Sequence, residues 1–127
     1  MEFTFNNVSS RTFNIKVKKS NHLSIPRKKL EFIEVQGRTD NLVVDEDCRD
    51  MLDIELECLI DCRSENTKEY SAGLDNWLNK SSGYNELKFD DGTVLKAIFI
   101  SQIDFNEITK NFNEIILQFK AYREEDL

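Results

Sequence analysis

The longest regular pattern in the chain lies between Met51 and Cys62. Apolar residues or cysteines stand at every second position, and they are Leu52, Ile54, Leu56, Cys58, Ile60 and Cys62. Most positions between them are Asp or Glu. A period of two is typical of a β-strand with one buried face. The sequence therefore predicts a long strand whose apolar face is covered by a second sheet or a helix.

Shorter alternating patterns predict further strands. Segments 2–5, 12–18 and 115–122 each place apolar residues at every second position. Such alternation is typical of antiparallel strands with one face on the core and the other in water. Asn6 and Asn7 follow the first of these segments, and because both tolerate positive φ, we expect the chain to fold back there.

Two more segments are apolar on both faces. Segment 28–35 is expected to be a strand, followed by a turn at 37–41 and an extended stretch at 42–44. Segment 93–102 follows Asp91-Gly92, a dipeptide that suits a two-residue type I′ hairpin turn after the strand 86–90. Strands with two apolar faces are typical of positions covered on both sides. One small domain cannot easily cover them all, so we expect the protein to self-associate.

One segment has a helical pattern. Its apolar residues recur at helical spacing and form one stripe, made of Tyr70, Leu74, Trp77 and Leu78. Asn66 is a suitable N-cap, and Gly83 lies just beyond the expected end. We expect Trp77 to be a core anchor between this helix and the sheet, rather than an exposed ring that stacks on a ligand.

Length and composition limit the possible partners. A chain of 127 residues is expected to form one domain. The net charge of -7 disfavours nucleic acid as a direct partner, because phosphate binding needs clustered Lys and Arg. The one basic run, 27–29, is interpreted as a solvated strand edge. No apolar run is long enough to span a membrane, so we expect no membrane partner.

Candidate sites for metals, cofactors and catalysis are weak. The acidic run 45–47 is interpreted as a solvated turn, because it lacks the ligand spacing and glycine of a calcium loop. Cys48, Cys58 and Cys62 lack zinc-site spacing and are interpreted as core residues of a protein made in a reducing cytoplasm. His22 is interpreted as a loop residue without a catalytic role. We therefore predict a protein without metal or cofactor that is not an enzyme.

Two other function classes have candidate residues. An enzyme would depend on an acid pair such as Glu55 and Glu57, which lie on the polar face of the long strand and are explained by solvation alone. A stand-alone carbohydrate-binding β-sandwich would need exposed aromatic rings, and Tyr84 and Tyr122 are the candidates.

A series of short motifs resembles a known family. In chain order they are Phe3-x-Phe5-Asn6-Asn7, Pro26-Arg27-Lys28, Val35-Gln36-Gly37-Arg38 with Asp40-Asn41, Cys58 in the long strand, Trp77-Leu78 at the helix end, Leu87-x-Phe89-Asp90-Asp91, Ala97, and Phe119-x-Ala121-Tyr122. Together they resemble the N-terminal domain of the distal tail proteins of long-tailed, non-contractile phages. The resemblance covers nearly the whole chain.

The resemblance implies a fold and a function. The fold is an antiparallel β-sandwich or split barrel with one α-helix and a protruding hairpin. The function is that of a structural subunit of a phage or prophage tail, located in the virion tail and, during assembly, in the host cytoplasm. Six copies would form a ring at the distal end of the tail tube, joining the tube to the tail tip and leaving a channel for DNA. Other tail proteins are the implied partners.

The resemblance also sets expectations for the domain and the interface. Because only a short charged tail follows the last predicted strand, we expect residues 1–127 to be a single ring-forming domain without the carbohydrate-binding-like domain that follows in family members. We expect the loop Gly37, Arg38, Thr39, Asp40 and Asn41 to contact a neighbouring subunit, with the guanidinium of Arg38 on a carboxylate across the interface. The alternative is a local ion pair of Arg38 with Asp40 or the acidic run 45–47.

Overall fold

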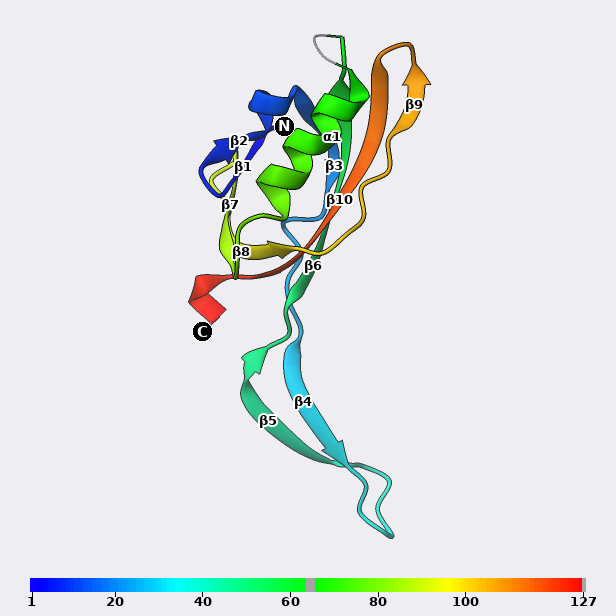
Figure 1. Ribbon diagram of the computed structural model, residues 1–127. Helices are drawn as coiled ribbons and strands as arrows, with labels where there is room; N and C mark the ends of the chain where they lie inside the picture. The colour runs from blue at the N-terminus through cyan, green and yellow to red at the C-terminus, as the bar shows by residue number, and fades with distance from the viewer. Residues whose placement is uncertain (64–65, 127) are drawn as a thin grey trace.

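The protein is mainly antiparallel β-structure with one α-helix. The computed structural model describes residues 1–63 and 66–126 (Figure 1). Its strands are β1 (Phe3–Phe5), β2 (Val8–Ser9), β3 (Ile15–Ser20), β4 (Lys28–Ile33), β5 (Leu42–Arg49), β6 (Leu52–Asp61), β7 (Asn85–Phe89), β8 (Val94–Phe99), β9 (Asn106–Thr109) and β10 (Phe112–Tyr122). Its helices are α1 (Thr67–Leu78) and two 3₁₀ turns, η1 (Ser10–Phe13) and η2 (Glu124–Asp126).

The main sheet curls around the core. Its strand order is β2-β1-β7-β8-β10-β6-β3, with β9 paired to β10. β1 and β10 are three strand positions apart, which in a flat sheet is roughly 14 Å. The ring centroids of Phe5 and Phe119, on those two strands, are nevertheless only 5.2 Å apart. The two halves of the sheet therefore face one another, as in a β-sandwich.

The long strand predicted from the period of two is β6. Its alternate residues, together with Cys62 just after it, are buried, whereas Asp53 and Glu55 on the other face are exposed. β10 pairs with β6 along their whole length, from Phe112 opposite Asp61 to Ala121 opposite Leu52. The prediction of a long strand with one buried face is confirmed.

Helix α1 covers the opening of the curled sheet. The side chain of Asn66 accepts a hydrogen bond from the backbone N–H of Glu69, 2.9 Å away, which confirms the predicted cap. The four residues of the apolar stripe are all buried. Gly73 stands in the middle of the helix, where the aromatic ring of Phe13 lies so close that a Cβ would be 2.8 Å from its Cε1.

Near the N-terminus, one predicted strand is confirmed and another is shortened. Asn6 and Asn7 have φ of 51° and 65° and form the two-residue turn between β1 and β2. The strand expected over 12–18 starts only at Ile15, because residues 10–13 form η1 and Asn14, at φ 56°, ends it in the left-handed region. This turn directs Phe13 toward α1 instead of into the sheet.

The hairpin β4–β5 overturns two expectations. It forms a separate two-stranded sheet that projects from the rest of the molecule (Figure 1). The segment 28–35 is therefore exposed on both faces in this chain, and the expectation that it is covered on both sides is wrong. The acidic run 45–47 belongs to β5 and is not a turn, since Asp45 pairs with Leu30 of β4. Asp47 has a φ of 56°, and the pairing of β4 with β5 shifts its register between Lys28 and Leu30, on the strand opposite.

Two predictions near the C-terminal half also need correction. The turn between β7 and β8 has three residues rather than two, because Phe89 pairs with Thr93 and only Gly92 of the dipeptide Asp91-Gly92 has positive φ, at 93°. The polar stretch 106–111 contains a strand that the pattern did not predict, β9, which pairs with β10 across a turn at Asn111. β8 lies between β7 and β10, as expected for an inner strand.

Candidate subunit interface

The projecting hairpin is the most unusual surface of the protein. We call residues 28–49 the arm and the remaining described residues the body. Directly opposite residues of an antiparallel pair share a face. The pairing therefore places Leu30, Phe32 and Val43 on one face and Ile33, Leu42 and Val44 on the other. All six are exposed, and Phe32 retains 61% of its accessible surface.

Charged residues at the base of the arm are paired within the chain. The guanidinium of Arg27 lies 3.7 Å from the carboxylate of Asp50, and the ammonium of Lys28 lies 3.8 Å from that of Asp45. All four side chains are at least 40% exposed. Such pairs contribute at most about 1 kcal/mol. These two ion pairs therefore add little to the stability of the arm.

The loop predicted as an interface is the tip of the arm. Gly37 has φ of 82°, and the N–H of Arg38 donates to the carbonyl of Val35 across 3.1 Å, which closes the turn. Nε and Nη2 of Arg38 donate to the two carboxylate oxygens of Asp40 at 3.1 and 2.7 Å. The local ion pair is thus present within the chain. With side-chain exposures of 57% and 69%, both groups are also accessible to a neighbour.

Trp77 lies inside the body. It retains 6% of its accessible surface and stacks on the ring of Phe13 at 4.9 Å and on that of Phe3 at 5.6 Å. Its indole N–H donates to the carbonyl of Phe5 across 2.8 Å. The side chain therefore joins α1, η1 and β1 in the core and is not available to a ligand.

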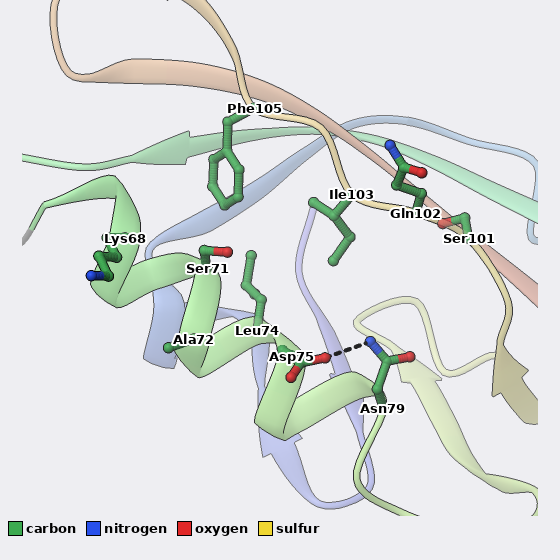
Figure 2. Close-up of a pocket in the computed structure, with 10 residues that line it drawn as sticks. All are labelled: Lys68, Ser71, Ala72, Leu74, Asp75, Asn79, Ser101, Gln102, Ile103 and Phe105. Atoms are coloured by element: carbon green, nitrogen blue, oxygen red, sulfur yellow. Dashed lines mark hydrogen bonds between the residues drawn. The ribbon is translucent and has the colours of Figure 1, made fainter.

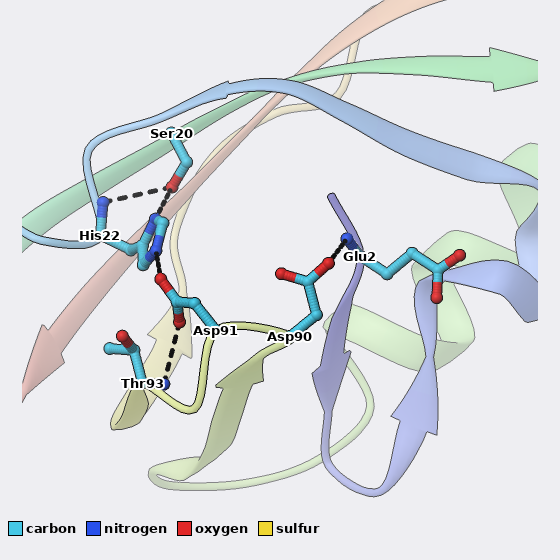
Figure 3. A network of polar contacts seen from close by, with 6 residues as sticks. All are labelled: Glu2, Ser20, His22, Asp90, Asp91 and Thr93. Carbon is cyan, nitrogen blue, oxygen red and sulfur yellow. Dashed lines mark hydrogen bonds and ion pairs between the residues drawn. The ribbon is translucent and has the colours of Figure 1, made fainter.

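His22 has a more specific environment than its place in a polar loop indicates. It is 5% exposed, and its ring stacks on Phe89 with centroids 4.1 Å apart. Nε2 lies 2.7 Å from Oδ2 of Asp91, and Nδ1 lies 2.7 Å from Oγ of Ser20 (Figure 3). Hydrogen bonds from His22 and from the N–H of Thr93 lower the pKa of Asp91 to about 2. Sequence reasoning missed this cluster, because Asp91 is 69 residues away along the chain.

The serine, histidine and aspartate of this cluster have the side-chain types of a hydrolytic triad. The hydroxyl oxygen of Ser20 also accepts the backbone N–H of His22, 3.2 Å away, so it is held inside a local turn. The pocket beside His22, which is lined by the β7–β8 turn and by Arg123 to Glu125, does not include Ser20. A substrate in that pocket would not reach the hydroxyl. What the cluster does in this structure is to connect the end of β3 to the β7–β8 turn.

A groove lies between α1 and the segment that joins β8 to β9 (Figure 2). Its volume is about 420 Å³, and Leu74, Ile103 and Phe105 form its apolar part. Asp75 lies at its rim, where its carboxylate accepts a hydrogen bond from the side chain of Asn79 at 3.0 Å. Ile103 and Phe105 also pack against the core, so they cover it from outside.

The other candidate residues lie at the surface or on the outer face of the sheet. Glu55 accepts a hydrogen bond from Gln118, and Glu57 lies opposite Ile116 on the outer face of the sheet. The rings of Tyr84 and Tyr122 contact each other edge to face at 5.1 Å. No group of three or more His, Cys, Asp or Glu side chains that is arranged to hold a metal occurs in residues 1–63 and 66–126.

The prediction that the cysteines are core residues is confirmed for Cys58 and Cys62, which are buried, but it is wrong for Cys48, which is half-buried on β5 in the arm and lies outside the core. All three cysteines are free, and burial raises the pKa of the Cys58 thiol to about 12, which leaves it unreactive. Within the described part of the chain, no helix has the length and apolar character needed to cross a membrane.

Comparison with known proteins identifies the fold. No family model matches the sequence, and no curated protein matches it. The chain is similar in structure to SPP1 Dit, which is described as a paradigm of the hub adsorption apparatus in phages that infect Gram-positive bacteria. The TM-score is 0.77 at 10% sequence identity, and the match covers 97% of this chain and 49% of Dit, so the chain spans about half the length of that protein. The protein therefore has the fold of a phage distal tail protein, as the sequence motifs imply.

Proposed function

We propose that the protein is a structural subunit of a phage or prophage tail. Six copies form a ring at the distal end of the tail tube, and the ring joins the tube to the tail tip and to other tail proteins. The shared fold with Dit supports a role in the tail. Residues 1–127 act as the ring-forming domain, and the protein resides in the virion tail after assembly in the host cytoplasm.

The observation that carries this proposal is the arm with two exposed apolar faces. A two-stranded hairpin is marginally stable alone in water. Burying a large apolar side chain contributes about 1.5 to 3 kcal/mol, and the six arm residues are about half exposed already, so each gains roughly half of that on contact. Burial of the three residues of one face then contributes roughly 2 to 5 kcal/mol of binding free energy. Association costs about 4 to 15 kcal/mol, so one face only just reaches the low end of that cost. Covering both faces is therefore the favourable outcome.

A ring meets this requirement. In a head-to-tail contact the arm of one copy binds a different surface on the next, so every copy both provides an arm and receives one. Such a set forms a closed ring when the rotation between neighbours adds up to a full turn. The tip residues 37–41 then contact the neighbour, where the guanidinium of Arg38 exchanges Asp40 for a carboxylate of the other subunit.

The experiment is a mass measurement in solution with electron microscopy of the particles. We expect the wild-type protein to form rings at tens of micromolar and Phe32→Ser to remain monomeric with an unchanged free energy of unfolding. The matched control is Ile108→Ser, which removes a side chain of similar exposure, 54%, from the body. A wild-type protein that stays monomeric, both alone and with tail-tube protein, would contradict the proposal; binding of the monomer to a glycan array would favour the carbohydrate-binding alternative.

The tip is tested separately by Arg38→Ala. Because its ion pair with Asp40 is exposed, we expect the substitution to leave monomer stability within about 1 kcal/mol of wild type. Loss of ring formation under those conditions supports a contact between subunits. A lowered stability with rings intact would show that Arg38 only braces the turn.

A further inference from the structure

The direction of the arm is set at the joint with the body. β4 and β5 pair only with each other, so no ladder of the main sheet fixes how the arm projects. The chain enters the arm through segment 21–27 and leaves it through residues 50–51. The orientation of the arm relative to the body therefore depends on the hydrogen bonds that these two short segments make.

The first anchor is Asn21, immediately after β3. Its side-chain amide donates to the carbonyl of Asp53 across 2.9 Å, and its side-chain oxygen accepts the N–H of Glu55 at 2.8 Å. The side chain thus continues the pairing with β6 beyond the point where β3 ends. This fixes the start of the segment on one half of the curled sheet.

The second anchor is His22, which reaches the other half of the sheet. With the proton on Nε2, the ring donates to Asp91, and Nδ1 accepts the hydroxyl proton of Ser20, while that hydroxyl oxygen accepts the backbone N–H of His22. Every polar group of the cluster then has a partner (Figure 3). Stacking on Phe89 fixes the plane of the ring. The segment is therefore held between β6 and the β7–β8 turn.

The far end of the segment is tied to the strand that leaves the arm. The carbonyl of Pro26 accepts a hydrogen bond from Arg49 at 3.3 Å, and the carbonyl of Arg27 accepts the N–H of Asp50 at 2.7 Å. Pro26 is buried, whereas Leu23 and Ile25 between the anchors are exposed at 70% and 77%. Leu23 and Ile25 therefore do not attach the segment to the body. The attachment depends on the hydrogen bonds at its two ends.

We infer that the His22–Asp91 pair is a latch that fixes the angle between the arm and the body. Asn21 alone leaves a pivot at the end of β3, and the second attachment removes that freedom. A fixed angle presents the arm in one orientation and so lowers the entropy cost of meeting a partner. This inference concerns the single chain and does not depend on ring formation.

The test is a distance measurement between two spin labels on the monomer. One label is attached at Thr39→Cys on the arm tip and the other at Asn76→Cys on the exposed side of α1, in a Cys48→Ser background; Cys58 and Cys62 are buried and do not react. Phe32→Ser is included in every sample to keep the protein monomeric. We expect one narrow distance in this reference protein and loss of that single distance in Asp91→Ala, which removes the exposed carboxylate that His22 contacts.

Two further variants separate the latch from general loosening. His22→Phe keeps the stacking on Phe89 but loses both ring hydrogen bonds, and it is expected to widen the distribution as Asp91→Ala does. Ser24→Ala changes an exposed residue of the same segment and is expected to keep the narrow distance. An unchanged distribution in Asp91→Ala, in a sample that circular dichroism shows to be folded, would overturn the inference, as would equal widening in Ser24→Ala.

Discussion

At the scale of single residues, Trp77 shows how a periodic pattern leads to a specific contact. The helical stripe predicts that this side chain faces the core, and the structure buries it against two phenylalanine rings. The hydrogen bond from its indole N–H to the carbonyl of Phe5 is not contained in the pattern. It depends on β1 lying beside α1, a contact between segments 72 residues apart.

We expect Trp77→Ala to lower the free energy of unfolding by about 3 to 5 kcal/mol, because it leaves a large cavity and an unpaired carbonyl. Urea unfolding followed by circular dichroism measures this change. Trp77→Phe retains a ring and is expected to cost less. A loss below about 1 kcal/mol for the alanine variant would show that the ring contributes little to packing.

His22 and Asp91 illustrate what residue patterns do not contain. A lone histidine in a polar loop carries no signal for burial, and an Asp-Gly pair signals a turn regardless of what the carboxylate binds. Their contact requires β3 and β7 to approach across the curled sheet. The burial of His22 and its contact with Asp91 could therefore not be read from the sequence.

At the scale of elements, strands and the helix were predicted best where one face is buried. β6, β10 and α1 each have one apolar face, and the core covers that face. The prediction that segment 28–35 is covered on both sides was wrong for the single chain. Apolar residues on both faces of a strand do not tell whether the strand lies inside its own domain or projects from it. The motif resemblance implies a protruding hairpin but does not say which segment forms it, and the structure assigns that place to β4 and β5 (Figure 1).

Within α1, the effect of a side chain at Gly73 can be tested. Alanine normally stabilises a helix interior by about 1 kcal/mol relative to glycine, but at position 73 its Cβ would meet the Phe13 ring at 2.8 Å. Because that ring is stacked on Trp77, we expect Gly73→Ala to give no gain in thermal stability or to lower it. Thermal unfolding measures the effect.

Two comparison variants isolate the steric cause. Ser71→Ala, at an exposed site of the same helix, is expected to raise stability by about 0.5 kcal/mol. In a Phe13→Leu background, Gly73→Ala is expected to become favourable. If Gly73→Ala alone stabilised the protein as much as Ser71→Ala does, the close contact with Phe13 would not destabilise the alanine variant.

At the scale of the whole molecule, the residues that form the core are separate from those that the proposed function assigns to association. Every side chain of the hydrophobic core belongs to the body, and none lies between residues 27 and 51. The body is therefore complete without the arm. Length alone does not separate the residues that form the core from those that project.

We expect a variant in which residues 30–45 are replaced by Asn-Gly to fold with a free energy of unfolding within about 1 kcal/mol of wild type, since only exposed residues are removed. The same variant is expected to be monomeric. Urea unfolding and light scattering provide the two measurements. A large loss of stability would mean that the arm supports the body, and retained rings would exclude it as the main contact.

Because the core contains no arm residue, the arm is free to vary without threatening the fold. Under the proposed function, a substitution there changes which surfaces the arm fits, whereas a substitution at Leu56 or Phe119 first threatens the fold itself. On that basis a lineage could exchange neighbours by altering some twenty residues in one continuous segment. Recombination that swaps this segment between related genes would then transfer the choice of partner in a single step.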